Sequence, residues 1–516
     1  MTQVARMTQV AVLPQDDPKP ESREQALAKA RADYVYDHGY QDVVLSEHVA
    51  EGEKFETAYL VQTVGIYTKL AANRAAIGMS RSHDVNADGK TDPKERLDLL
   101  RATLKKSGIP SERVGGIADF EALYPKSGLP VSARHWREDW YFAWQRLAGG
   151  YPVQLERLRE ITDRLPLTDA HLRAATGDDD TLDAAVAEHR LYVCDYAILD
   201  GLPCGQFNGW QKYLWAPLAV FAVKRGPGGP RERFVPVGIQ CGQTPGPKRP
   251  IWTPADGVAW DMAKCTVQTA DAHTREIGAH TGLCHLIMEA VLLASRRELA
   301  PNHPLLRLLI PHLAMTQATN DVMRKSFIGP GGVMENYQSP TLEGAFTLIH
   351  RTLDRFDLGA SDLAPDLAAR GVDDREALPW YPYRDDAELV MAAIRQWVAA
   401  YLSVYYPSDD AVRADSELRA WIRALGAPSA GAVRGVPDVQ TRDALAHLVA
   451  SLIWRSTAYH SVINYTGWEF LGWLPNQPTA AFGRGPSTTE PNTEQDLINM
   501  WPPLDVTIGV HDVMYQ

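Results

Sequence analysis

Histidines are the residues of this chain whose number and spacing are best suited to chemistry. Five of its fifteen histidines fall in one short window, and a sixth, His460, is followed four residues later by Asn464. The window contains His273, His280, His285, His303 and His312. Such clustering indicates a metal site, although a single buried histidine more often bonds a backbone carbonyl and has only a structural role.

The spacing of these histidines narrows the choice of ligands. Residues five apart, such as His280 and His285, point about 140° away from each other on a regular α-helix, whereas a π-type turn bonded from i to i+5 brings them onto nearly one face. We therefore expect a local irregularity of the helix here, which Gly282 makes easier to form. His460 and Asn464 share one face of an ordinary helix because they are four apart.

The types of ligand favour a redox-active metal. Three neutral imidazoles, one amide oxygen and at most one carboxylate suit a first-row transition metal with open positions, whereas Ca²⁺ and Mg²⁺ prefer shells made only of oxygen. Iron is the leading candidate. Zinc would use the same residue types for hydrolysis, so the ligand types alone leave that alternative open.

The elements that must position these residues are mainly helical. Apolar residues recur at helical spacing over 23–175, including 153–165, and again over 254–516, where some helices are apolar nearly all round. Short β-type runs over 190–245 predict a small antiparallel patch. Residues 1–22 are polar and contain proline, so we expect a mobile tail there. The predicted fold class is mainly α, a large helical bundle with a small β patch.

Composition restricts the partners of the chain. It has 516 residues, a formal net charge of −12 and no run rich in lysine and arginine, which disfavours a nucleic-acid partner and fits a neutral or apolar substrate. The five cysteines are scattered and never spaced as C-x-x-C, so we expect buried thiols in a reducing compartment. No signal-peptide pattern and no apolar run of about 20 residues is present, so a cytoplasmic protein is expected.

Two runs of the sequence resemble those of the lipoxygenases, a family of iron-dependent fatty-acid dioxygenases. Residues 260–312 have the W-x2-AK opening, the paired histidines, the HP step and the LL-x-PH ending of that family. Residues 456–479 are similar to its third-histidine helix and its PN-x-PT turn. Together with Asp139–Pro152 and the β patch, the resemblance covers the chain from about residue 130 onward.

The resemblance implies a lipoxygenase-type helical bundle over 23–516 that binds non-haem iron. Its ligands would be His280, His285, His460 and, weakly or through water, Asn464. It implies that a ferric hydroxide removes a hydrogen from the methylene between two cis double bonds of a polyunsaturated fatty acid. Molecular oxygen would then add to the radical and give a hydroperoxide, while the apolar bundle keeps water away.

The remaining histidines of the window have lesser roles in that resemblance. It implies helix-boundary and packing roles for His303 and His312, and it assigns none to His273. For all three, a structural role is the simpler interpretation.

The sequence departs from the family pattern at its end. Lipoxygenases usually end in an isoleucine whose terminal carboxylate binds the iron, whereas this sequence ends at Gln516. We expect a shortened form of the family's catalytic domain, and the alternative is that another group, such as water, replaces that carboxylate. Three histidines without the carboxylate should bind iron less tightly and shift its potential.

Three further positions near the expected metal also differ. Gly467 stands where the family commonly has a glutamine, so a hydrogen bond that orients Asn464 is expected to be absent. Met323 stands where the family has alanine or glycine before an arginine, at the site that governs where oxygen reaches the substrate radical, and Phe327 replaces a common leucine. Both larger side chains should narrow this pocket. The alternative is that both simply pack in the core.

A second metal is indicated by an EF-hand-like loop over 84–95. Its candidate calcium ligands are Asp84, Asn86, Asp88, Asp92 and Glu95. Against calcium, Thr91 replaces the usual apolar residue, and only one such loop is present, so a solvated turn is the alternative. If calcium binds, we expect it to affect stability or peripheral membrane contact and not the chemical step.

Three functions are compatible with these patterns. The first is a lipoxygenase-type dioxygenase of the linoleate type, which the complete histidine set favours. The second is a lipoxygenase-like lipid-binding protein impaired in catalysis, which the short end and Met323 favour. The third, a zinc hydrolase, is weaker because no H-E-x-x-H arrangement is present. Positional specificity, the preferred fatty acid and the oligomeric state do not follow from the sequence.

Overall fold

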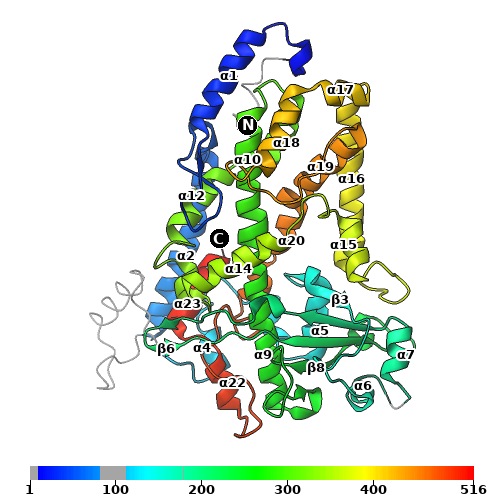
Figure 1. The fold of residues 1–516 in the computed structure, drawn as a ribbon. Helices are drawn as coiled ribbons and strands as arrows, with labels where there is room; N and C mark the ends of the chain where they lie inside the picture. The colour runs from blue at the N-terminus through cyan, green and yellow to red at the C-terminus, as the bar shows by residue number, and fades with distance from the viewer. Residues whose placement is uncertain (1–9, 82–111, 178, 516) are drawn as a thin grey trace.

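Helices make up most of the protein and pack in one large bundle, with a small β-sheet at one end (Figure 1). The structure is a computed structural model that describes residues 10–81, 112–177 and 179–515. The architecture confirms the predicted fold class, mainly α with small antiparallel sheets.

One long helix runs through the middle of the bundle (Figure 1). It comprises α9 (Val258–His273), the π-helical segment η8 (Thr274–Leu286) and α10 (Ile287–Glu298). Most of its side chains are buried, as expected for a helix that is apolar on nearly all sides. It is long and apolar enough to cross a membrane, but 83% of its most apolar window is buried inside the protein, as in the core helix of a bundle.

Shorter helices surround this central helix. In the first half of the chain they are α1 (Pro20–Asp33), α2 (Thr57–Arg81), α4 (Ile117–Glu121), α5 (Asp139–Ala148), α6 (Asp169–Thr176), α7 (Leu182–Ala187) and α8 (Pro230–Arg233). After the central helix come α11 (Pro304–Leu309), α12 (Thr316–Ser326), α13 (Val333–Tyr337), α14 (Leu342–Arg355), α15 (Leu363–Arg370), α16 (Pro382–Tyr405), α17 (Asp409–Ala414) and α18 (Ser416–Gly426). The last group is α19 (Arg442–Trp454), the π-helical segment η10 (Arg455–Tyr459), α20 (His460–Asn464), α21 (Gly467–Leu471), α22 (Glu494–Met500) and α23 (Leu504–Met514).

The sheet has five antiparallel strands in the order β3-β4-β7-β8-β9. The strands are β3 (Leu155–Arg157), β4 (Leu191–Asp195), β7 (Leu218–Val223), β8 (Phe234–Gln240) and β9 (Ile251–Trp252). The patch predicted over 190–245 contains the three central strands, and the edge strands come from outside it. Two further two-stranded sheets pair β1 (Tyr36–Asp37) with β2 (Leu45–Ser46) and β5 (Gln206–Phe207) with β6 (Trp210–Gln211).

The prediction of a helix over 153–165 is wrong. The chain instead forms one 3-10 turn, η5 (Pro152–Gln154), and then β3, where Leu155 pairs with Cys194. Leu155 is fully buried, so the apolar spacing there serves the sheet and the core. Periodicity over so short a stretch does not separate a helix from an edge strand, and pairing with β4 decides the outcome.

The expectation of a mobile tail over 1–22 also differs from the part of it that the structure describes. Residues 1–9 lie outside the described residues. In the rest, the side chain of Leu13 is buried, the amide of Val12 donates to the carbonyl of Asn302 at 3.0 Å, and α1 already begins at Pro20. The polar composition of this segment gave no sign that Leu13 packs in the core.

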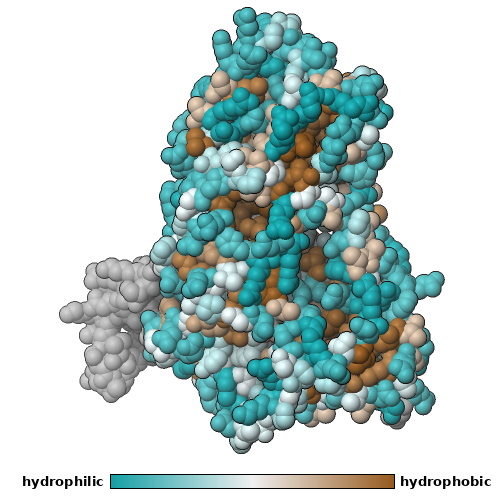
Figure 2. Space-filling model, in the orientation of Figure 1, coloured by the Kyte–Doolittle hydropathy of each residue, from teal (hydrophilic) through white to brown (hydrophobic). Residues whose placement is uncertain are grey.

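The surface agrees with this arrangement. On the face shown in Figure 2 most residues are hydrophilic, and apolar residues appear as patches in the upper and middle part and at the lower right. Of the five free cysteines, Cys194, Cys265 and Cys284 are buried as predicted, whereas Cys204 and Cys241 are only partly buried.

Candidate metal centre

The central helix is π-helical where two of the histidines lie. His280 and His285 both belong to η8, whose i to i+5 bonding places residues five apart on nearly one face. Their Nε2 atoms are 3.1 Å apart. The predicted irregularity between these two histidines is therefore confirmed, and it brings their side chains together on one face of the helix.

The third histidine comes from a second helix that is also interrupted by a π-helical segment. His460 is the first residue of α20, directly after η10. Its Nε2 atom lies 3.0 Å from Nε2 of His280, and one ligand atom from each of the three histidines lies within 4.8 Å of the others. Two helices that are far apart in the sequence thus bring three imidazole nitrogens to one point.

The distances between these nitrogens fit a transition metal. Two imidazole nitrogens that bind one metal at about 2.1 Å lie about 3.0 Å apart in neighbouring octahedral positions and about 3.4 Å apart in tetrahedral ones. The observed 3.0 and 3.1 Å match the octahedral value. The three nitrogens can therefore bind one metal ion together.

The environment keeps these histidines in the form that binds metals. Burial, reinforced by the neighbouring His280 and His460, holds the pKa of His285 well below its usual value. Burial and the neighbouring His280 lower the pKa of His460 to about 4. Both imidazoles are therefore neutral at pH 7, as metal binding requires.

Hydrogen bonds to Nδ1 orient two of the rings. A carboxylate oxygen of Glu276 lies 3.3 Å from Nδ1 of His280, and the amide oxygen of Asn320 lies 2.8 Å from Nδ1 of His285. If each Nδ1 bears the proton and donates to that oxygen, Nε2 is left free for the metal. The amide nitrogen of Asn320 donates in turn to the carbonyl of His285 at 3.1 Å and to Glu289 at 2.7 Å.

Sequence reasoning missed Glu276, Asn320 and Glu289. Glu276 precedes His280 by four residues on one helix, so its spacing was a usable signal. Asn320 lies on α12 and reaches His285 only through the packing of that helix against η8, for which the sequence contains no local signal.

Arg275 links the two helices that bear the histidines. Its Nε donates to the carbonyl of Ile463 at 2.8 Å, its Nη2 donates to the same oxygen, and its Nε lies 3.5 Å from a Glu276 oxygen. Burial opposes the charge on Glu276, yet the Arg275 guanidinium keeps the pKa of that carboxyl below its usual value. A Cβ at Gly467 would lie 3.4 Å from Nη2 of Arg275, and one at Gly150 would lie 3.0 Å from its Cζ. The two glycines therefore leave the space that the guanidinium fills.

The three other residues predicted near the metal are placed less directly. Asn464 is the last residue of α20, is exposed, and has no hydrogen bond with the histidine cluster among the described residues, so its role as a ligand stays a prediction. Met323 is buried on α12, three residues after Asn320 and hence on a similar face. Phe327 caps the end of that helix and packs against the core.

The remaining histidines of the window are structural where their bonds are described. His273 is buried, its Nδ1 lies 2.6 Å from the carbonyl of Thr269, and its Nε2 accepts from the amide of Ser339. His303 caps α11, where its Nδ1 accepts from the amide of Leu305. These bonds confirm the structural interpretation of His273 and the helix-boundary role of His303.

The calcium loop predicted over 84–95 lies outside the described residues. Its candidate ligands therefore stay a prediction from spacing alone.

Comparisons with known proteins agree with this site. A family model described as Lipoxygenase matches residues 122–500. The chain is 34% identical over 428 residues to linoleate 9/13-lipoxygenase of Pseudomonas aeruginosa, covering 80% of this chain and 61% of that protein. It thus spans less than two thirds of that relative's length.

Solved structures show the same fold. The chain resembles coral 8R-lipoxygenase, with a TM-score of 0.85 and 25% identity over 98% of this chain and 73% of that one. It also resembles a manganese lipoxygenase, with a TM-score of 0.78 and 21% identity over 98% of this chain and 86% of that one, a likeness of fold alone. Because the family model matches well over half of the sequence, the chain belongs to the lipoxygenase family.

Proposed function

We propose that this protein inserts molecular oxygen into polyunsaturated fatty acids of the linoleate type, at an iron held by His280, His285 and His460. The observation that supports this most directly is the convergence of the three Nε2 atoms, with His280 Nε2 at 3.0 Å from that of His460 and 3.1 Å from that of His285. The named activity of the Pseudomonas aeruginosa relative supports the substrate class. When bound, such a metal supplies a one-electron acceptor next to the substrate.

The residues of the chain itself have three tasks in this proposal. Glu276 and Asn320 hold His280 and His285 in one orientation, because each offers an oxygen to Nδ1. The buried walls exclude water from a reactive radical. Met323, which follows Asn320 by one turn of α12, narrows the space where oxygen approaches.

Metal analysis of the purified protein tests the assignment. We expect about one equivalent of iron per chain and little or none in His285→Ala. His447→Ala is the matched control, because His447 is exposed on α19 and its Nδ1 lies near the carbonyl of Asp443 and not near the histidine cluster. Manganese in place of iron would correct the metal, whereas stoichiometric zinc or a full iron complement in His285→Ala would contradict the proposal.

Oxygen uptake with linoleate tests the reaction. We expect uptake by the wild type, none by His285→Ala, and a higher rate or a changed product ratio for Met323→Ala. Iron-loaded protein that consumes no oxygen with linoleate or with longer polyunsaturated acids would favour the impaired lipid-binding alternative.

A further inference from the structure

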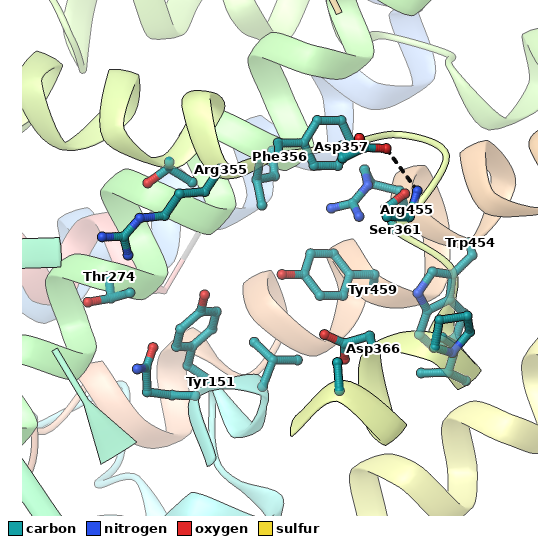
Figure 3. Close-up of a pocket in the computed structure, with 18 of the residues that line it drawn as sticks. Tyr151, Thr274, Arg355, Phe356, Asp357, Ser361, Asp366, Trp454, Arg455 and Tyr459 are labelled. Atoms are coloured by element: carbon teal, nitrogen blue, oxygen red, sulfur yellow. Dashed lines mark hydrogen bonds between the residues drawn. The ribbon is translucent and has the colours of Figure 1, made fainter. Parts of the chain in front are cut away.

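A cavity of about 540 Å³ is lined by residues of η8, α14, α15 and η10 and by residues next to β3 and β4 (Figure 3). None of the three metal-binding histidines lines it. Leu283, which lies between His280 and His285 in η8, and Tyr459, which precedes His460, nevertheless form part of its wall. The cavity therefore shares both ligand-bearing helices with the metal centre.

Arg455 is the unusual residue of this cavity. Its side chain is buried, with the residue only 8% exposed, and its Nη1 has no hydrogen-bond partner. Within the described part of the chain it makes no ion pair, and its guanidinium instead lies over the rings of Phe356 and Tyr459, at 4.7 and 5.1 Å from their centroids. Two cation–π contacts offset only part of the cost of burying a charge.

Every other buried arginine that the structure describes has an oxygen to bond. The five are Arg23 with Glu417, Arg146 with Asp271, Arg190 with Asp180, Arg275 with Ile463 and Arg384 with Asp385. Arg146, Arg275 and Arg384 each also have one buried nitrogen without a partner, but Arg455 is the buried arginine that bonds no oxygen at all among the described residues. It faces a cavity large enough for a ligand.

Three tyrosine hydroxyls that line the same cavity also lack hydrogen-bond partners among the described residues. They belong to Tyr151, Tyr383 and Tyr459. Figure 3 shows the hydroxyls of Tyr151 and Tyr459 directed into the open space between them. Burial raises the pKa of Tyr151 and Tyr383, so these two phenols stay protonated and can donate.

The carboxylates of the wall do not neutralise Arg455. Asp195 forms an ion pair with Arg164 at 2.5 Å, and Asp366 forms one with Arg370 at 2.7 Å. Asp357 accepts from the amide of Ala360 at 2.9 Å and is exposed at the rim. The lining also includes Arg355, which is exposed, so Arg455 is the buried charged side chain of this wall that makes no ion pair among the described residues.

The rest of the wall is suited to a hydrocarbon. Its apolar residues are Val153, Ile198, Leu283, Phe356, Leu363 and Trp454. A ligand with one anionic end and one apolar end would match both parts of the cavity.

We propose that this cavity binds a long-chain monocarboxylate, with the carboxylate at Arg455 and the tyrosine hydroxyls and the hydrocarbon against the apolar wall. The same chemistry could come from a substrate molecule on its way to the metal or from a second acid that is not oxidised. The binding step does not depend on the proposed oxygenation, because a saturated acid satisfies it.

Calorimetric titration of the metal-loaded chain with myristate and with 1-tetradecanol at pH 8 tests the site. We expect myristate to bind at least tenfold more tightly than the alcohol, and Arg455→Met to remove that difference. Arg434→Gln is the matched control, because Arg434 is exposed, pairs with Asp354 and does not line the cavity. Equal affinity of the wild type for acid and alcohol, or unchanged myristate binding by Arg455→Met, would overturn the proposal.

Two further variants keep the test decisive if Arg455→Met does not fold. Ala360→Trp, which fills the cavity from its rim, should weaken binding of both ligands at least tenfold, and unchanged binding would overturn the proposal. Tyr383→Phe should weaken only the binding of myristate, and equal weakening of the alcohol would overturn the role of the hydroxyl.

Turnover of linoleate in the presence of myristate identifies the source of the ligand. If the cavity binds the substrate, myristate should raise the KM for linoleate at constant kcat. If it binds a second acid that is not oxidised, myristate should change kcat. In either case Arg455→Met should abolish the effect of myristate. A protein that binds myristate through Arg455 but consumes no oxygen would refute the proposed function and leave this site standing.

Discussion

Two buried arginines next to the metal centre behave in opposite ways. Arg275 lies in η8 and bonds the carbonyl of Ile463 through two nitrogens, with Glu276 beside it. Arg455 begins η10 and bonds no oxygen in the described residues, although it is almost as deeply buried. Both precede a histidine of the cluster by five residues, so position along the chain does not explain the difference.

The difference indicates two uses of a buried charge. A charge that is surrounded by acceptors holds elements together, and removing it leaves its partners unsatisfied. A charge without acceptors weakens the empty protein and offers an attractive point to an anion. Arg275 therefore belongs to the framework of the metal centre, and Arg455 belongs to a site for a ligand.

The strongest test of this comparison is Arg275→Met. We expect the free energy of unfolding to fall by about 3–5 kcal/mol, because Glu276 keeps its charge in a buried place without a counter-ion. Urea denaturation of the wild type and the variant measures the change. A loss below about 1 kcal/mol would mean that the bonds of Arg275 do not hold the two helices together.

The second test concerns the protonation of His273, a buried and hydrogen-bonded histidine that lies seven residues before His280 on the central helix. Burial lowers the pKa of His273 to about 4, below its usual value of about 6.5, so the unfolded chain binds more protons between these values. Stability should therefore be retained above pH 6.5 and fall as the pH drops toward 4, by about 2 kcal/mol between pH 7 and pH 5. Denaturation at both pH values measures this, and His273→Gln, which cannot titrate, should show a smaller difference. An equal difference in that variant would assign the pH dependence to other groups.

The third test asks whether the groups behind the histidines act on the metal. Asn320→Leu removes the acceptor for Nδ1 of His285, so we expect metal affinity to fall by about 10-fold or more. Competition with a chelator measures the affinity. Ser326→Ala, an exposed position on the same helix, is the control and should not change it. If both variants bind the metal as the wild type does, Asn320 has only a packing role.

The smallest expected effect has the opposite sign. Arg455→Met in the ligand-free protein should leave the free energy of unfolding unchanged or raise it by up to about 1 kcal/mol, because an unpaired buried charge is replaced by an apolar side chain of similar length. The denaturation series used for Arg275→Met measures it directly. A loss of more than about 1 kcal/mol would make Arg455 part of the framework and remove the contrast between the two arginines.

Much of the metal centre could be predicted from the sequence because its information is local. The spacing of His280 and His285 required a π-helical turn, and that turn is present. Glu276 was within reach of the same reasoning, since it is four residues from His280. The helical bundle and the central strands followed from apolar periodicity, which depends on neighbouring residues alone.

The rest depended on contacts between segments that are far apart in the chain. The spacing of apolar residues over 153–165 predicted a helix, but pairing with β4 makes part of this segment a strand. The composition around Leu13 predicted a tail, but its side chain is buried in the core. Asn320 reaches His285 across helices. The sequence likewise does not show that Arg275 bonds oxygen acceptors and Arg455 bonds none. The tertiary structure decides this, because it determines which groups pack around each buried charge.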